Sequence, residues 1–285
     1  AKMNLNKPTG WSSLARKEYF GLVGGTDPRT SGTNLVMFLA IIDQNGWDKG
    51  WELLTSIAAN IGRYSNSSKS TINSVVSGDV AVVGAIDYYA HSKMSRFASK
   101  GLSYVVPDDL FVLNADPISI LKGTDNLEGA QRFIDFLMTE EAQKLLVLPK
   151  GHKEGPSIES MGRIAVHEQV FKKTTGERLP VLNPFVVQNK SPLNLERVFK
   201  YKYIFMDLFG ATLVDLHGKL KKRYKELLDE EDIQGLMALR APIVSEKEIL
   251  ALAEKWHDQE LRNKKIAEWS HAFRAKLHEK SRLSF

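Results

Sequence analysis

Short apolar runs alternate with polar, serine-rich loops along the N-terminal third of the chain. Residues 20–25, 80–86 and 102–106 are short runs, each the length of one buried strand, of which 80–86 is rich in β-branched residues, and residues 61–64 fit a further short strand. Residues 35–43, 47–60, 71–76 and 91–100 carry the longer or amphipathic pattern of helices. This repeated order of strand, loop and helix predicts an α/β fold.

The later part of the chain has helical periodicity. Residues 126–148 predict a pair of helices, and residues 196–240 and 245–280 predict two long helices that pack on the second region as scaffold. Ser245, three residues before Glu248, predicts a capping box. The Asn-Ala-Asp-Pro sequence at 114–117 suits a bend or a crossing between lobes. We therefore expect an opening segment at 1–19, an α/β ligand-binding lobe at 20–112, a return to the other lobe at 113–195 and a helical C-terminal region at 196–285.

Composition narrows the class of protein. The net charge is +5, but acidic and basic residues are interspersed, and the densest basic stretch, 219–225, is followed at once by acidic residues. This pattern is typical of a solvated helix face, so we expect no nucleic-acid partner. The chain has no cysteine, which excludes disulfides, thiolate zinc sites and a cysteine nucleophile. No apolar run approaches the ~18 residues of a membrane span.

Two loops that open helices are rich in hydroxyl and amide side chains. The first joins the strand at 20–25 to the helix at 35–43, and the second precedes the helix at 71–76. A helix N-terminus with free N–H groups binds anions, although N-capping alone accounts for Ser and Thr here equally well. The candidate ligand-binding residues of these loops are Thr30, Ser31, Gly32, Thr33, Asn34, Asn66, Ser67 and Ser68.

A third candidate site follows the apolar run at 80–86. Asp87, Tyr88 and Tyr89 come just past the expected carboxyl end of that strand, where ligands bind in open α/β sheets. Ordinary surface aromatics are the simpler explanation for a tyrosine pair. No nucleotide fingerprint, phosphate-binding loop, zinc-protease motif or serine-nucleophile motif occurs, and no histidine has a partner at a metal-ligand spacing. We therefore expect no enzyme.

The order of several segments resembles a known family. The segments are GLVGGTDP at 21–28, TSGT at 30–33, SNSS at 65–68, SGDVAVVGAIDYY at 77–89, DPISILKGT at 116–124 and AQRFIDFLMTEEAQKLL at 130–146. Together they resemble the solute-binding proteins of bacterial and archaeal ABC importers, in the branch that includes ferric-ion-binding proteins. The resemblance covers residues 8–160, and the 122–146 segment is its most specific part.

The resemblance implies a two-lobe fold of the type II periplasmic binding proteins that closes on its ligand. It implies a periplasmic or extracellular, monomeric receptor that delivers Fe(III) or a small anionic solute from an interlobe cleft to ABC permease subunits. Tyr88 and Tyr89 match the Fe(III)-ligating pair of ferric members. Residues 31–33 and 66–68 match loops that hold the accompanying anion, and no other cofactor is implied.

The sequence departs from the family in two places. Family members begin with a further stretch that builds most of the first lobe, and this chain starts near the first crossing between lobes. Asp87 stands where ferric members commonly carry an amide. A small organic anion therefore stays open as the solute, and a sensor or enzyme module on the same two-lobe fold is the alternative function.

Overall fold

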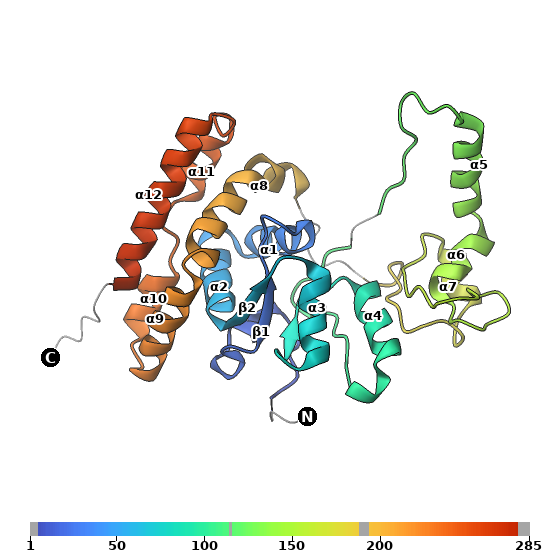
Figure 1. Ribbon diagram of the computed structural model, residues 1–285, viewed down its shortest axis with the longest axis horizontal. Helices are drawn as coiled ribbons and strands as arrows, with labels where there is room; N and C mark the ends of the chain where they lie inside the picture. Colours follow the sequence, from blue (N-terminus) through green and yellow to red (C-terminus); the bar gives the residue numbers. More distant parts are fainter. Residues whose placement is uncertain (1–4, 114–115, 188–193, 279–285) are drawn as a thin grey trace. The chain divides into compact units, whose positions relative to one another are not determined.

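The computed structural model describes residues 5–113, 116–187 and 194–278 and divides into two compact units (Figure 1). Unit 1 comprises Ala1–Ala85, Val105–Val112 and Ser191–Phe285, and unit 2 comprises Ile86–Tyr104 and Leu113–Lys190. The chain passes from unit 1 to unit 2 between residues 112 and 113, where we expected a crossing between lobes. Residues 86–104, which we expected in the ligand-binding lobe, group with 113–190. The expected four-part division stays a prediction.

Unit 1 is built on a parallel sheet of order β2-β1-β3. Its strands are β1 (Val23–Thr26), β2 (Ile61–Ser65) and β3 (Val82–Val83). The strands approach so closely that a Cβ on Gly24 of β1 would lie 2.6 Å from a methyl group of Val83. Of the strand expected at 80–86, only the two residues of β3 are extended and paired, and residues 102–106 form no strand at all. An apolar run becomes a strand only where a neighbouring strand pairs with it.

Helices α1 (Gly32–Asn45), α2 (Trp47–Asn60) and α3 (Ser68–Ser77) complete the N-terminal part of unit 1, after two short 3₁₀ turns at Trp11–Ala15 and Lys17–Tyr19. Helix α2 buries the face that its periodicity predicts, and Trp51 at its centre is fully buried. The Trp51 ring meets Phe205 and Phe209, whose centroids lie 6.1 and 6.4 Å away. An aromatic cluster of this kind buries a large apolar area and fixes the helices in place.

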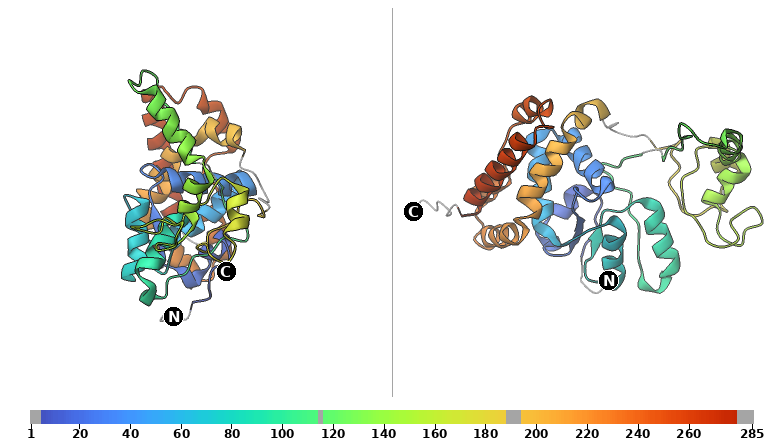
Figure 2. Two further views of the ribbon diagram at one scale, coloured as in Figure 1. Left: turned by 90° about the vertical axis from the view of Figure 1, so that its right-hand side faces the viewer. Right: turned by 45° about the horizontal axis from the view of Figure 1, so that its top comes forward.

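The C-terminal helices belong to this same core. They are α8 (Leu195–Phe209), a π-helical turn (Gly210–Val214), α9 (His217–Asp229), α10 (Ile233–Arg240), α11 (Glu246–Ala253) and α12 (Gln259–His278). Figures 1 and 2 show α8 and α9 beside α2. The prediction that these helices pack on the second region is wrong, because the buried faces of α8, α9 and α12 share one hydrophobic core with α1 and α2.

The two long helices that we expected are each interrupted. Glu231 has a positive φ of 53°, which ends α9, and Asp232 then caps α10 by accepting a hydrogen bond from the Gly235 N–H at 2.8 Å. Trp256 separates α11 from α12 and donates its indole N–H to the buried Asp207 at 2.9 Å. The capping box of Ser245 and Glu248 is confirmed.

Unit 2 has a small core and is helical in its regular elements. These are α4 (Asp87–Arg96), a 3₁₀ turn (Ala98–Lys100), α5 (Leu127–Leu137), α6 (Glu140–Val147) and α7 (Glu168–Lys173). The core joins α6 and α7 through Val147, Val170 and Phe171. The helix pair expected at 126–148 is present as α5 and α6. The expected bend at 114–117 lies partly outside the described residues.

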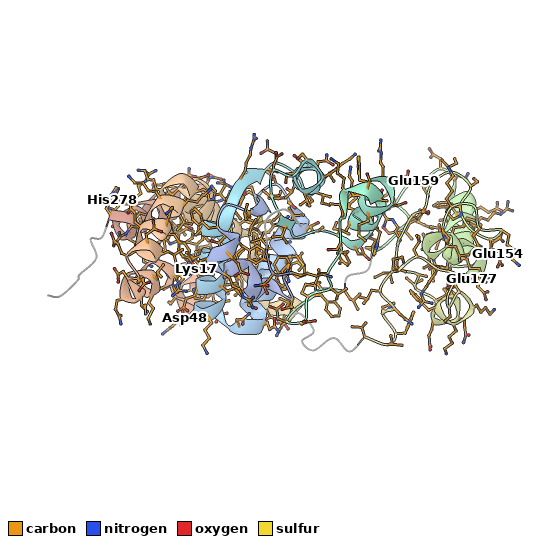
Figure 3. All side chains as sticks on the ribbon, turned by 90° about the horizontal axis from the view of Figure 1, so that it is seen from below. Lys17, Asp48, Glu154, Glu159, Glu177 and His278 are labelled. Atoms are coloured by element: carbon orange, nitrogen blue, oxygen red, sulfur yellow. The ribbon has the colours of Figure 1, made fainter. Side chains whose placement is uncertain are left out.

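Charged side chains lie on the outside of each unit. Figure 3 labels several of them, including Lys17 and Asp48 of unit 1, which are both exposed. Among the described residues, no helix combines the length and the apolar content needed to cross a bilayer.

Candidate functional site

Two helix N-termini meet at the carboxyl edge of the unit 1 sheet. Strands β1 and β2 are adjacent and parallel, so the loops that follow them leave the sheet on the same side. These loops lead to Ser31, the N-cap of α1, and to Ser67, the N-cap of α3. The Ser31 and Ser68 hydroxyl oxygens lie 2.8 Å apart. The structure therefore brings together the two serine loops that the sequence singled out.

The contact between Ser31 and Ser68 leaves one hydroxyl hydrogen of the pair free. The Ser31 Oγ also accepts the backbone N–H of Asn34 and the Asn34 Nδ2, both at 3.3 Å. The two hydroxyls have two hydrogens, and their mutual contact at 2.8 Å uses one of them. The other hydrogen has no role in this network and can donate to a ligand.

The positive ends of both helices lack compensating charge. Neither α1 nor α3 has an acidic residue in its first turn. The first N–H groups of a helix have no partner within it, and the dipole of each helix favours an anion there. Lys69 is exposed in the first turn of α3 and adds its positive charge to the positive end of the helix dipole. An anion is the ligand that would satisfy all of these groups.

The other predicted residues of these loops surround the Ser31–Ser68 contact. Ser31 and Asn34 are buried, Ser68 and Thr33 are half-buried, and Thr30, Gly32, Asn66 and Ser67 are exposed. The Thr30 hydroxyl donates to the carbonyl oxygen of Asp27 at 3.1 Å, which shapes the loop before Ser31. Thr26 and Thr71 add a further link that we did not predict, with hydroxyl oxygens 2.5 Å apart. This link ties the end of β1 to α3.

Tyr88 and Tyr89 lie in unit 2, in the first turn of α4. The expectation that they follow directly on a strand end is wrong, because α4 begins at Asp87 and β3 ends at Val83. Their ring centroids are 4.4 Å apart. Asp87 faces the backbone, and its carboxylate accepts the Tyr88 N–H at 2.8 Å. The predicted site residues thus form two sets, one in each unit.

The surroundings of Tyr88 keep its phenol protonated. A hydrogen bond with Tyr89, then burial and the charge of Tyr89, raise the pKa of Tyr88, and the Arg163 guanidinium opposes the shift. Among the described residues, no group of three or more His, Asp or Glu side chains could hold a metal ion. A phenol must lose its proton to bind Fe(III), so binding of that ion at Tyr88 would release a proton.

Two arginines that complete these sets carry no recognisable sequence motif. The Arg163 guanidinium lies 3.9 Å from the centroid of the Tyr88 ring and pairs with Asp116 at 2.9 Å. Arg29, in the loop before α1, pairs with Asp27 and with Asp215. The Arg163 contacts and the Arg29–Asp215 pair join segments far apart in the chain, which no local motif marks.

Comparison with known proteins places the chain in a family. Residues 2–159 match the model of the bacterial extracellular solute-binding protein family. The phosphoglycerate transport regulatory protein PgtC of Salmonella typhimurium is 26% identical over 148 residues, which are 51% of this chain and 36% of PgtC. An uncharacterized protein of Haemophilus influenzae is 25% identical over 182 residues, 63% of this chain and 47% of that protein. The chain thus spans less than half the length of these relatives.

Two solved structures are similar to this chain. The periplasmic binding protein AfuA of Actinobacillus pleuropneumoniae, with fructose-6-phosphate bound, matches 79% of this chain and 61% of its own, with a TM-score of 0.51 and 22% identity. The periplasmic binding protein P5PA matches 73% of this chain and 61% of its own, with a TM-score of 0.49 and 18% identity. The expected α/β periplasmic-binding-protein fold is confirmed. The chain belongs to the bacterial extracellular solute-binding proteins, a non-enzymatic family that works outside the cytoplasm.

Proposed function

We propose that this chain is the solute-binding component of an ABC importer and that its solute is a small phosphate ester. The phosphate binds where α1 and α3 begin, and the Ser68 hydroxyl and the free N–H groups of the two first turns donate to it. The partner is the permease of the importer.

The observation that carries this proposal is the contact between Ser31 and Ser68. It holds two helix N-termini without acidic residues at one place, at the sheet edge where ligands bind in α/β folds. The names of known proteins agree with a phosphate ester: PgtC is named for phosphoglycerate transport, and AfuA was solved with fructose-6-phosphate.

Fe(III) is the other solute that the sequence suggested, on the strength of Tyr88 and Tyr89. Binding of Fe(III) would have to release the proton of Tyr88, whose pKa is raised, first of all by its hydrogen bond with Tyr89. A phosphate ester needs no such proton release. We therefore favour the organic anion over the metal.

Calorimetry with matched pairs of solutes tests the proposal. The pairs are 3-phosphoglycerate with glycerate and fructose-6-phosphate with fructose, with ferric citrate as the metal probe. Two charge-assisted hydrogen bonds, at about 1.5 kcal/mol each, make the phosphorylated member bind on the order of a hundredfold more tightly. Equal affinity for the two members of each pair would overturn the proposal, as would tight binding of ferric citrate with a visible phenolate band.

Acid should weaken the same binding. A phosphate monoester gains a proton with a pKa near ~6, which halves the charge that the helix N-termini attract. We expect affinity to fall between pH 7 and pH 5 for the ester. An affinity that stayed constant over this range would argue against a dianionic ligand.

A further inference from the structure

Arg29 is held between two carboxylates in unit 1. Its Nε and Nη2 donate to Asp27 at 3.0 and 2.8 Å, and its Nη1 and Nη2 donate to Asp215 at 3.0 and 2.7 Å. The guanidinium is therefore bidentate on both sides, which is the strong geometry for such a pair. With its donors so engaged, Arg29 is not available as a free cation for a solute.

The partner segment is shaped to receive this side chain. Asp215 follows directly on the π-helical turn at Gly210–Val214, and π-turns inside helices often occur at functional sites. Arg29 lies flat against Gly210, where a Cβ would come within 2.6 Å of its Cδ and Nε atoms. A glycine at this point thus lets the arginine reach Asp215.

The other end of this contact is the loop that leads into the Ser31 cap. Asp27 accepts the backbone N–H of Arg29 at 2.8 Å, and its carbonyl oxygen accepts the Thr30 N–H at 3.0 Å. The turn at 27–30 is therefore closed on itself and tied to Asp215, the residue that follows the π-helical turn. Arg29 also offsets the charge of Asp27, whose carboxylate is only 15% exposed. Left unpaired, that negative charge would stand beside an anion site.

We propose that Arg29 is a positioning residue for solute binding: by tying Asp27 to Asp215 it holds the loop before Ser31, and it sets the affinity without touching the solute. This inference rests on the proposed phosphate site. It also predicts that the effects of replacing Arg29 and Asp215 are coupled, because each residue needs the other to hold the loop.

A matched arginine elsewhere in unit 1 makes the test sharp. Arg197 also bridges two carboxylates, Glu246 and Asp43, and its side chain is 36% exposed against 33% for Arg29. We expect Arg29→Met to weaken binding of 3-phosphoglycerate and fructose-6-phosphate at least tenfold, and Arg197→Met to change it less than twofold. Equal effects of the two variants would overturn the inference.

A double-mutant cycle tests the coupling between Arg29 and Asp215. Asp215→Asn should weaken binding in the parent and add little in the Arg29→Met background. Independent, additive effects of the two changes would overturn the inference.

Hydrogen exchange separates this inference from the proposed function. Without any solute, Arg29→Met should speed amide exchange in residues 30–35 more than Arg197→Met does. If neither phosphate ester binds the parent, the proposed function fails, while the exchange data still test whether Arg29 holds the loop before Ser31. If the esters bind and exchange at 30–35 is unchanged, the positioning role of Arg29 is refuted.

Discussion

Replacing Ser31 by Ala should damage folding and binding together. The hydroxyl caps α1 through the Asn34 N–H and contacts the Ser68 hydroxyl, and Ser31 is buried. Loss of an N-cap costs about 1 kcal/mol, and loss of a buried hydrogen bond costs about 1 kcal/mol more. We therefore expect the free energy of unfolding of unit 1 to fall by about 2 kcal/mol.

Tryptophan fluorescence during urea unfolding measures this change in unit 1 alone. All five tryptophans of the sequence lie in segments of unit 1, at positions 11, 47, 51, 256 and 269. Ser245→Ala is the matched control, because Ser245 caps α11 in the same way but lies exposed. The control should cost about 1 kcal/mol.

Binding distinguishes the two variants further. Ser31 holds Ser68 and the start of α1 in place, so Ser31→Ala should weaken phosphate-ester binding at least tenfold, as calorimetry would show. Ser245→Ala should leave it within twofold. If Ser31→Ala lost stability but kept full affinity, Ser31 would be a cap and nothing more, and the assignment of the site would be refuted.

Two other predictions concern the rest of the molecule. Burial lowers the pKa of His217, so the unfolded chain takes up the proton first; unit 1 should lose stability in urea as the pH falls below about 6.5, and less so in His217→Phe. Gly62→Ala places a Cβ 2.3 Å from a backbone oxygen and should cost about 1–3 kcal/mol, whereas Gly218→Ala, in open space within α9, should stabilise by about 0.5–1 kcal/mol; equal urea midpoints would contradict both.

Local chemistry made the helix starts of unit 1 predictable from sequence. The serine loops, the amphipathic pattern of α2 and the capping box at Ser245 each depend on neighbouring residues, and each is present. Strand lengths were not predictable, because β3 extends only as far as β1 pairs with it. The breaks between the C-terminal helices depend on the positive φ of Glu231 and on the contact of Trp256 with Asp207, 49 positions away.

Long-range contacts likewise limited the prediction of the candidate site. Ser31 and Ser68 are 37 residues apart, and the parallel order of strands gave a reason to expect them at one edge. Arg29 and Asp215 are 186 residues apart, and nothing in either segment points to the other. Tyr88 and Tyr89 were placed beyond a strand, because the apolar run at 80–86 does not show where extended structure gives way to α4.

The sequence left two interpretations of the serine loops, N-capping and ligand binding, as alternatives. The hydrogen bonds show why they need not compete. Ser31 caps α1 by accepting from Asn34 and at the same time shares a hydrogen bond with Ser68. Capping of one helix thereby orients a hydroxyl on the next and leaves one hydroxyl hydrogen of the Ser31–Ser68 pair free. A residue that reads as a cap in sequence can therefore prepare a donor for an anion without contacting that anion itself.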